Sequence, residues 1–457
     1  MHERGVQFVS DRSFYRAESA QARDLAVLAV SVFKSRSPDQ PFRVLDVMAG
    51  SGVRGARYLQ QAGVDAVWCN DHNSSVHNEL VMNLCGGVAH LTAEEAGERQ
   101  GRGADPLRPS VRVSHMDAQR LLAACYLAED YYDLIDIDSF GSDTSFLGSA
   151  LDALKHGGLL FLTSTDGFSS AGLRPTHSLA AYGAYLRALP CANEQGLRML
   201  IGAAVREGAS RGLALSPVFS LYSYHGPVFR VMLRATRSAL WPAQHYAFLA
   251  HCHLHGTTRA QHWRHLSDAV CRCNEGKPGV RPTPLVLSGP LWTGPLHCAK
   301  VVGEMQQEAA RRGWNGHSWS TSGSSAVPDA GERGAQPGSP PTTHAQLATP
   351  GSRKHKARPL EALLALLLEE SDPRLPPGFL PLDVLGRHLV RFPQRDQLIQ
   401  QLRDAGFAAA RCHLDDKALR TNASFQACMA AARSLGIAAR EDDSFASPSG
   451  EVEGSRS

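Results

Sequence analysis

The chain of 457 residues is longer than one ordinary hydrophobic core, so two domains and some linker sequence are expected. Charged residues make up 20% and hydrophobic residues 43%, the balance of a soluble globular protein, and a formal net charge of +3 is too small to indicate a nucleic-acid-binding protein by itself. No apolar run approaches the roughly 20 residues of a membrane span, and residues 1–18 lack the apolar core of a signal peptide. We therefore expect a soluble intracellular protein without membrane contact, in the nucleus, the cytoplasm or an organelle such as the chloroplast or mitochondrion.

Short apolar or β-branched runs alternate with helix-like segments from Arg43 to about Thr236. The runs include RVLDVMAG, AVWCND, VRVSHMD, YDLIDID and GGLLFLTSTD. This alternation is typical of a parallel sheet with crossover helices, because parallel strands need a long connection back across the sheet. We expect an α/β first domain over residues 1–236.

A glycine-rich turn follows the first run, in VLDVMAGSGVRGARY. Gly50 and Gly52 separate a predicted strand from a predicted helix, so backbone can approach a ligand closely at the helix N-terminus. Such a turn alone is weak support for a site.

Two later strand ends strengthen the prediction of a ligand site. Asp71 closes the next strand, where a carboxylate can accept hydrogen bonds from ribose hydroxyls, and Asp117 with Ala118 closes the one after that, where an adenine edge could be bound.

The run LIDIDSFGSDTSFL carries two aspartates in or at the end of a predicted buried strand. An ionised carboxylate in that position costs several kcal/mol unless it is paired. We expect Asp136 to be a buried structural partner of the N-terminal segment and Asp138 to emerge at the rim of a site. Acidic residues at successive strand ends indicate the adenosine-binding edge of a methyltransferase-type Rossmann sheet rather than a nicotinamide dehydrogenase.

Residues 237–313 contain possible metal ligands in the motifs HCHLHG and CRC. Cys252, His255, Cys271 and Cys273 could bind zinc tetrahedrally, and free thiols with surface histidines are the alternative. The ten cysteines are scattered along the chain, which indicates reduced thiols rather than a disulfide framework.

Residues 314–358 are rich in Ser, Gly, Pro and Thr and poor in large apolar residues, so we expect a disordered linker or insertion there.

The second domain is expected to start in residues 237–313 and to continue after the linker, in residues 359–440, as a small α+β module. PLEALLALLLEE has a helical apolar stripe, and DQLIQQLRDAGF followed by AAARCHL indicates a helix and then a strand. The tail, 441–457, is expected to be disordered.

Taken together, these motifs resemble the tRNA guanine-26 N2-dimethyltransferase family. The shared motifs occur in the family's order: FYRAESAQARDLAVLAV, DVMAGSGVRGARY, IDIDSFGSDTSFLGSAL, GGLLFLTSTD, EQGLRMLIG, GPLWTGPLH and DAGFAAARCHLDDKALRTNAS. The resemblance runs from about Phe14 to Thr421. It implies S-adenosyl-L-methionine as the cofactor and tRNA as the partner of a monomer. It also implies a Rossmann-like class I methyltransferase domain followed by a smaller α+β C-terminal domain.

By position, the family's cofactor contacts fall on Arg23, Arg54, Asp71, Asp117 and Ala118. The family's second domain is thought to hold tRNA near AAARCHLDDKALRTN, so Arg411, His413 and Arg420 are expected to contact phosphate, with a solvated basic face as the alternative.

The family's active-site loop, Asp-Pro-Phe-Gly, falls on Asp138, Ser139, Phe140 and Gly141. Asp138 is expected to align the guanine amine and accept its proton, and Phe140 to stack on the base, with a core aromatic as the alternative for Phe140. Ser139 and Gly141 are expected to contact the substrate. Serine at 139 replaces a proline that would stiffen the loop, and YSYHGPVFRV departs from the family's Asp-His-Tyr element.

The resemblance therefore predicts methyl transfer from S-adenosyl-L-methionine to N2 of guanine 26 in tRNA, giving N2-methyl- and N2,N2-dimethylguanine. The departures leave two alternatives. One is a catalytically weakened paralogue that binds and remodels tRNA, and the other is a guanine-N2 methyltransferase for another RNA position. The intact acid and glycine set favours activity, since a pure binding protein has no evident use for it.

Overall fold

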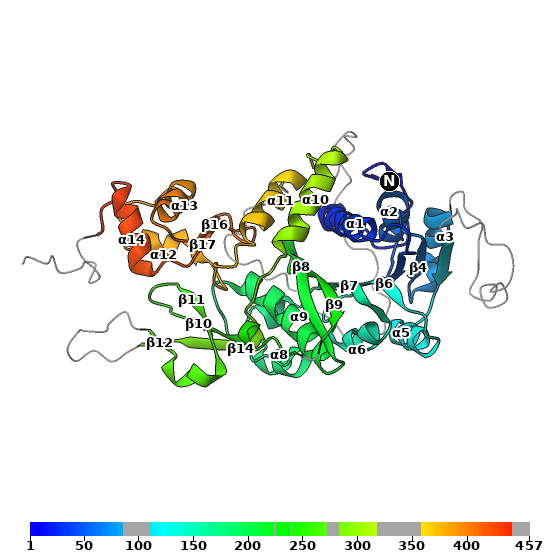
Figure 1. Cartoon of the computed structure of the whole chain (residues 1–457), viewed down its shortest axis with the longest axis horizontal. Coiled ribbons are helices and arrows are strands. Elements are labelled where there is room, and N and C mark those ends of the chain that lie inside the picture. Colours follow the sequence, from blue (N-terminus) through cyan, green and yellow to red (C-terminus); the bar gives the residue numbers. More distant parts are fainter. Residues whose placement is uncertain (86–109, 224, 239, 272–282, 318–357, 441–457) are drawn as a thin grey trace, which may run out of the picture.

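The computed structural model describes residues 1–85, 110–223, 225–238, 240–271, 283–317 and 358–440 (Figure 1). Most of the expected linker, residues 318–357, lies outside the described residues, as do the expected tail 441–457 and Cys273. None of the described helices is long and apolar enough to cross a membrane.

A seven-stranded sheet organises the first half of the chain. Its spatial order is β5-β4-β3-β6-β7-β9-β8, with β9 antiparallel to both of its neighbours and the pairs from β5 to β7 parallel. The strands are β3 (Arg43–Asp46), β4 (Ala66–Asn70), β5 (Ser110–Ser114), β6 (Tyr132–Asp138), β7 (Leu154–Ser164), β8 (Leu213–Ser223) and β9 (Val228–Arg237). The chain turns from one half of the sheet to the other between β3 and β6. In α/β sheets, ligands bind beyond the carboxyl ends of the strands at such a point.

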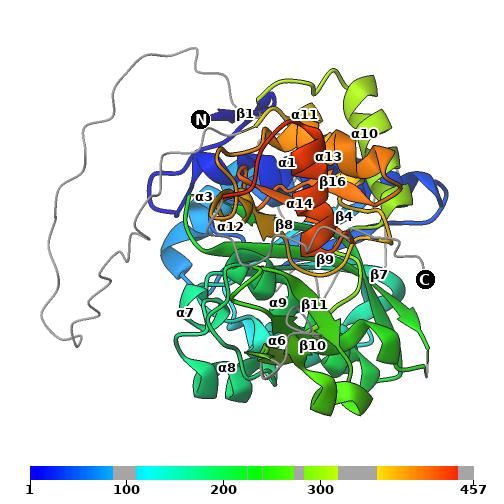
Figure 2. The ribbon, with the colours of Figure 1, turned by 90° about the vertical axis from the view of Figure 1, so that its left-hand side faces the viewer.

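Helices cover both faces of this sheet, and Figure 2 shows α1 on one side with α6 and α9 on the other. The first side carries α1 (Ala20–Ser35), α2 (Val53–Ala62) and α3 (His77–Cys85); the second carries α5 (Ala118–Leu127), α6 (Thr144–Asp152) and α9 (Ala192–Ala209). Because both faces are covered, the central strands are apolar on both sides, as in GGLLFLTS of β7. The expected Rossmann-like architecture is confirmed, and its core lies on both sides of the sheet.

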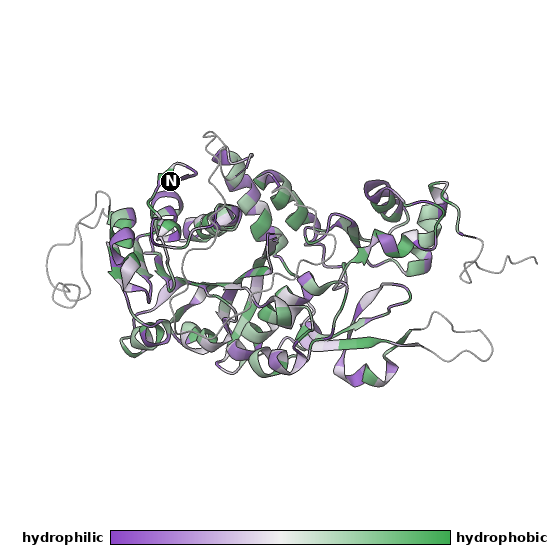
Figure 3. Ribbon diagram, turned by 180° about the vertical axis from the view of Figure 1, so that it is seen from behind, coloured by the Kyte–Doolittle hydropathy of each residue, from purple (hydrophilic) through white to green (hydrophobic). Residues whose placement is uncertain are grey.

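Two later helices complete the first face. α10 (Ala299–Arg311) and α11 (Leu360–Glu369) pack together, α10 packs on α1, and all three lie side by side in Figure 1. α10 buries Val301, Val302, Met305 and Ala309, one stripe of an amphipathic helix that is also visible in Figure 3. These side chains share a core with α1. Helices from the segments expected to form the second domain thus cover the seven-stranded sheet.

The remaining elements form smaller units at the other end of the molecule (Figure 1). One sheet has the order β11-β10-β14, and another, β15-β17-β16, packs with α12, α13 and α14 around a separate core. The bounds are β10 (Tyr246–His251), β11 (Thr258–Gln261), β14 (Val286–Trp292), β15 (Leu380–Pro381), β16 (Ala409–Arg411), β17 (Ala418–Thr421), α12 (Leu382–Gly386), α13 (Arg395–Asp404) and α14 (Phe425–Ser434). The helix and strand predicted from DQLIQQLRDAGF and AAARCHL are α13 and β16.

Short elements make up the rest. They are β1 (His2–Glu3), β2 (Val6–Gln7), β12 (Val270–Cys271), β13 (Thr283–Pro284), α7 (Gly167–Ser170) and α8 (Pro175–Tyr182).

The expected boundary of the linker at residue 314 lies too early in the chain. The guanidinium groups of Arg4 and Arg57 lie over the Trp314 ring, 5.2 and 5.4 Å from its centroid. Trp314 therefore belongs to the folded protein.

Candidate cofactor and catalytic site

The loop between β3 and α2 requires its glycines. Gly50 and Gly52 have φ values of 54° and 74°, a region that favours glycine, and a Cβ on Gly52 would come within 2.8 Å of Leu80. α2 begins directly after Gly52. The backbone is therefore free of side chains where it passes the N-terminus of a ten-residue helix, the arrangement in which amides can face a bound ligand.

Asp71 lies directly beside this loop, at the end of β4. Its two carboxylate oxygens accept hydrogen bonds from the amides of Gly50 and Asn73, both at 2.9 Å. Each oxygen keeps a further lone pair for a donor such as a sugar hydroxyl. Asp117 caps α5 by accepting a hydrogen bond from the Arg120 amide at 3.0 Å, and Ala118 is the buried first residue of that helix.

Asn70 holds the ends of three strands in place, a function that the sequence analysis missed. Its side-chain amide donates to the carbonyls of Val47 and Met116 at 3.1 and 2.9 Å, and its oxygen accepts from the Met116 amide and the Ser114 hydroxyl. The residue is fully buried. The neighbouring Asp71 carried the sequence signal, and nothing local marks Asn70 as a bridge between strands.

Asp136 and Asp138 share one arginine at the end of β6. The Arg54 guanidinium donates to Asp136 at 2.5 Å and also to Asp138, and the Tyr58 hydroxyl donates to Asp136 at 2.8 Å. The prediction that Asp136 is buried is confirmed, but its partners lie on α2 rather than in the N-terminal segment. The Asp138 side chain is 35% exposed and so reaches the rim of the site.

A third carboxyl group, Asp46 of β3, pairs in register with Asp136. It is buried, and among the described residues neither of its carboxyl oxygens has a hydrogen-bond partner. Burial, followed by the negative charge of Asp136, raises the pKa of Asp46 well above its usual range. These surroundings favour the neutral form of Asp46, while the Arg54 guanidinium donates to the other two carboxyl groups.

A second buried cation lies in the same row of the sheet. Asp138 is in register with Thr163 of β7, and Thr163 with Arg230 of β9, so the three side chains point to one face. Arg230 donates to the hydroxyls of Ser223 and Ser19 at 2.5 and 2.9 Å. Burial lowers the pKa of Arg230 to about 10, and the group stays charged at neutral pH. Asp138 thus pairs with the Arg54 guanidinium and lies two strands from the Arg230 guanidinium on the same face of the sheet.

The loop after Asp138 exposes one aromatic ring. Phe140 is 79% exposed and makes an edge contact with Phe14, itself 62% exposed, with ring centroids 5.6 Å apart. The alternative of a core aromatic is therefore excluded for Phe140. Gly141 is fixed to the end of β7: its amide donates to Thr165 at 2.7 Å, and its carbonyl accepts from the Thr165 amide at 2.9 Å.

Ser139 does not face this surface. The side chain is buried, and its hydroxyl donates a hydrogen bond to Asp143, which is also buried. The expectation that Ser139 contacts the substrate through its side chain is therefore wrong, because the hydroxyl is committed to a partner inside the loop.

Arg23 lies in a buried ionic cluster with the N-terminal strand β1. Its guanidinium donates to both carboxylate oxygens of Glu3, at 2.8 and 2.5 Å, and Arg57 donates to the same carboxylate at 2.6 Å. Burial opposes ionisation of Glu3, but the two arginines outweigh it and lower the pKa of Glu3 to about 2. A cofactor contact by Arg23 would have to share this guanidinium with Glu3.

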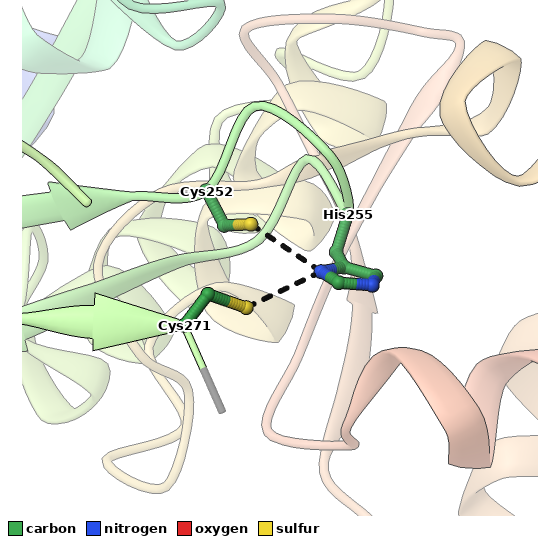
Figure 4. Close-up of side chains that lie close together, drawn as sticks. All are labelled: Cys252, His255 and Cys271. Carbon is green, nitrogen blue, oxygen red and sulfur yellow. Dashed lines mark hydrogen bonds between the residues drawn. The ribbon is translucent and has the colours of Figure 1, made fainter. Parts of the chain in front are cut away.

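Three of the four predicted metal ligands converge, as Figure 4 shows. Cys252 and His255 come from the loop after β10 and Cys271 from β12, and the two sulfurs lie 3.3 and 3.4 Å from His255 Nδ1. Bonds of ~2.3 Å to sulfur and ~2.0 Å to nitrogen at tetrahedral angles place such ligand atoms roughly 3.5 Å apart. The donor set and its spacing therefore fit zinc.

The predicted phosphate-binding side chains are mostly buried, which corrects that prediction. Arg420 donates to Glu194 of α9 at 2.7 Å and to Glu370 at 2.8 Å, and His413 donates to Glu370. Arg420 and His413 have no surface from which to reach a phosphate. Arg411 alone is partly exposed, at 36% of its side chain, and it pairs with Glu369.

The sequence model of the TRM family, N2,N2-dimethylguanosine tRNA methyltransferase, matches residues 2–318. The chain belongs to this family. A tRNA (guanine(26)-N(2))-dimethyltransferase of Pyrococcus abyssi is 26% identical over 415 residues, covering 90% of each chain, and one of Thermococcus kodakarensis is 27% identical over 414 residues with the same coverage. A solved structure also shares the fold: Trm1 from Pyrococcus horikoshii in complex with S-adenosyl-L-methionine superposes with a TM-score of 0.66 and 22% identity, covering 93% of this chain and 96% of that one.

Proposed function

We propose that this chain transfers methyl groups from S-adenosyl-L-methionine to the exocyclic N2 of guanine 26 in tRNA, giving N2-methyl- and N2,N2-dimethylguanine. The observation that carries the proposal is the meeting of a glycine loop, Asp71 and Asp138 at one edge of the sheet. Curated relatives that align over 90% of the chain carry the activity on guanine 26 in their names, and this supports the choice of substrate.

The cofactor would lie over the ends of β3, β4 and β5. The Gly50–Gly52 backbone leaves room for it, Asp71 offers carboxylate oxygens to the ribose hydroxyls, and Asp117 with Ala118 flanks the adenine. Arg54 and Arg23 would be near the methionine end, where both are already engaged with carboxylates. Bound in this way, S-adenosyl-L-methionine supplies the methyl group.

Asp138 would act on the guanine amine. The lone pair of N2 is delocalised into the ring, so the amine must be aligned with the methyl donor and must lose a proton as its bond to carbon forms. The Asp138 carboxylate is exposed enough to accept a hydrogen bond from N2 and then the proton. A second transfer requires that Asp138 release this proton to solvent before the monomethylated amine is presented again.

Phe140 and Phe14 would hold the base. Both rings are exposed at the rim next to Asp138, and an edge contact between aromatics leaves a face of each ring open. Aromatic faces stack on unpaired bases in RNA recognition, with a gain of about 1–3 kcal/mol per base. Guanine 26 would have to leave the tRNA core to reach them.

Zinc would join the loop after β10, which carries Cys252 and His255, to Cys271 of β12. The donor atoms and their spacing fit the metal, and structural zinc sites stabilise small folds. Metal analysis of the purified protein should find one zinc per chain, which Cys252→Ser with Cys271→Ser removes. A wild-type protein without zinc that keeps its melting temperature on addition of a chelator would contradict this part of the proposal.

Binding of tRNA as a monomer remains a prediction. Among the three basic side chains named for phosphate contact, Arg411 is the one with exposed surface that supports the expectation.

The proposal is tested by mass spectrometry of nucleosides from tRNA incubated with the enzyme and labelled S-adenosyl-L-methionine. Label in N2-methyl- and N2,N2-dimethylguanosine that maps to position 26 supports it. Label at another guanine would favour the alternative substrate, and tRNA binding without label would favour the weakened paralogue.

A further inference from the structure

The loop from Asp138 to Asp143 contains an internal hydrogen bond between two side chains. The Ser139 hydroxyl donates to Asp143 Oδ1, and both residues are buried. Asp143 occupies the N-cap position of α6, a position where aspartate normally accepts a hydrogen bond from the first turn of the helix. Its side chain makes no such capping bond. The carboxyl group is therefore turned toward Ser139 instead of the helix.

The surroundings of Asp143 disfavour its charged form. Burial, followed by the nearby Asp138 and Asp136, raises the pKa of Asp143 well above its usual range, although the bond from Ser139 acts in the opposite direction. A protonated Asp143 accepts the hydrogen bond from Ser139 and places no negative charge beside the Asp138 carboxylate.

The remaining part of the loop is fixed to β7. Gly141 exchanges hydrogen bonds with Thr165, and its carbonyl also accepts from the Ser164 hydroxyl at 2.7 Å. The first half of the loop starts at Asp138, which pairs with Thr163 of β7, and the Ser139–Asp143 hydrogen bond closes it from within. Between these anchors, Phe140 projects into solvent.

We propose that the Ser139–Asp143 hydrogen bond fixes the loop that presents Asp138 and Phe140. Asp143 is a positioning residue in this inference, because it acts through Ser139. The inference rests on the proposed function for its consequence in catalysis. A loss of fixed geometry of this kind commonly lowers the rate about 100-fold for a displacement of ~1 Å.

Proline at 139 gives a direct way to separate stiffness from chemistry. Asp138 ends a β-strand, and an extended conformation is what a residue before proline adopts. Ser139→Pro should therefore stiffen the loop without the help of Asp143.

The test measures hydrogen exchange in the peptide covering 138–144 and single-turnover methyl transfer to guanine-26 tRNA. Asp143→Ala should speed the exchange and lower the rate by about 10- to 100-fold. Asp143→Asn keeps a neutral acceptor for Ser139 and should resemble the wild type. Ser139→Pro combined with Asp143→Ala should restore slow exchange and most of the rate. Ser145→Ala, which removes an exposed hydroxyl just after this peptide, is the control and should change neither.

Wild-type exchange in Asp143→Ala, or no rescue by Ser139→Pro, would overturn the inference. A low rate in Asp143→Asn with wild-type exchange would also overturn it, since the carboxyl group would then have a chemical function. A wild-type protein that methylates no guanine-26 tRNA would instead defeat the proposed function, and the exchange pattern of the variants would still decide whether this hydrogen bond fixes the loop.

Discussion

Arg54 donates a hydrogen bond to Asp138, so a side chain expected to bind the cofactor is joined to the side chain expected to accept the proton. The same guanidinium pairs with Asp136 inside the sheet. Arg54 of α2 therefore connects the partly exposed Asp138 at the rim of the site to the buried Asp136 inside the sheet. Any change at Arg54 therefore affects both the fold and the proposed chemistry.

The first prediction concerns this connection. Arg54→Met leaves the Asp136 carboxylate buried without its cation, and breaking a buried ion pair from one side usually costs about 3–5 kcal/mol. We expect a loss of that order in the free energy of unfolding, measured by urea denaturation. Arg120→Met on α5 removes an exposed arginine and is the control. Equal stability of the two variants would show that Asp136 does not depend on Arg54.

The second prediction separates Arg420 from Arg411. Arg420→Met removes the cation shared by Glu194 and Glu370 and should lower the free energy of unfolding by about 3–5 kcal/mol. Arg411→Met alters a half-exposed pair and should cost less than about 1 kcal/mol. If Arg411 contacts phosphate, its removal should also reduce the salt dependence of tRNA binding by about one counterion. An unchanged slope would leave Arg411 as a solvated side chain.

The third prediction concerns acid stability. The folded-state pKa of Glu3 is about 2, below its usual value of 4.5, so its contribution to stability is present above pH 4.5 and is lost as the pH falls toward 2. A shift of this size corresponds to about 3 kcal/mol. The difference in unfolding free energy between the wild type and Glu3→Gln should narrow over that range. A difference that stays constant from pH 6 to pH 2 would contradict the pairing of Glu3 with Arg23 and Arg57.

The fourth prediction concerns residues 318–357. The Leu360 amide donates to the Gly316 carbonyl at 3.3 Å, so the two sides of this segment are held together. Replacement of 318–357 by a short Gly-Ser turn should leave the melting temperature and methyl transfer nearly unchanged. Trp314 must be kept, because it packs on Arg4 and Arg57. A large loss of stability in this deletion would show that the segment contributes to the fold.

The sequence predicted the features that depend on short-range patterns. Alternating apolar runs indicated the parallel sheet, and Gly50, Asp71, Asp117 and Asp138 indicated its carboxyl edge, because each lies at or shortly after the end of a strand. Parallel strands bring these ends together regardless of the loops between them. The site could therefore be located before the fold was known.

Features that depend on distant pairing were not predictable in this way. Arg420 looks like a surface cation in its own segment, and its partner Glu194 is 226 positions away along the chain. The same holds for Asn70, whose bridging function requires three strand ends in space. Burial of a charge is decided by such partners, so local composition assigned Arg420 and His413 to the wrong environment.

The central claim is that Asp138 accepts the proton from guanine N2. Single-turnover methyl transfer by Asp138→Asn tests it most directly, since asparagine keeps the shape but removes the negative charge. Asp136→Asn is the matched control, because its carboxylate is buried and should affect stability rather than the chemical step. Cofactor affinity, measured by calorimetry, should be similar in the wild type and in Asp138→Asn.

The experiment uses a tRNA transcript with guanine at position 26 beside one with adenine there. We expect Asp138→Asn to transfer methyl groups to the guanine transcript about 10²–10⁴-fold more slowly than the wild type, the range for a positioned acid or base, and neither enzyme to label the adenine transcript. A wild-type rate in Asp138→Asn, with the cofactor bound, would contradict the claim.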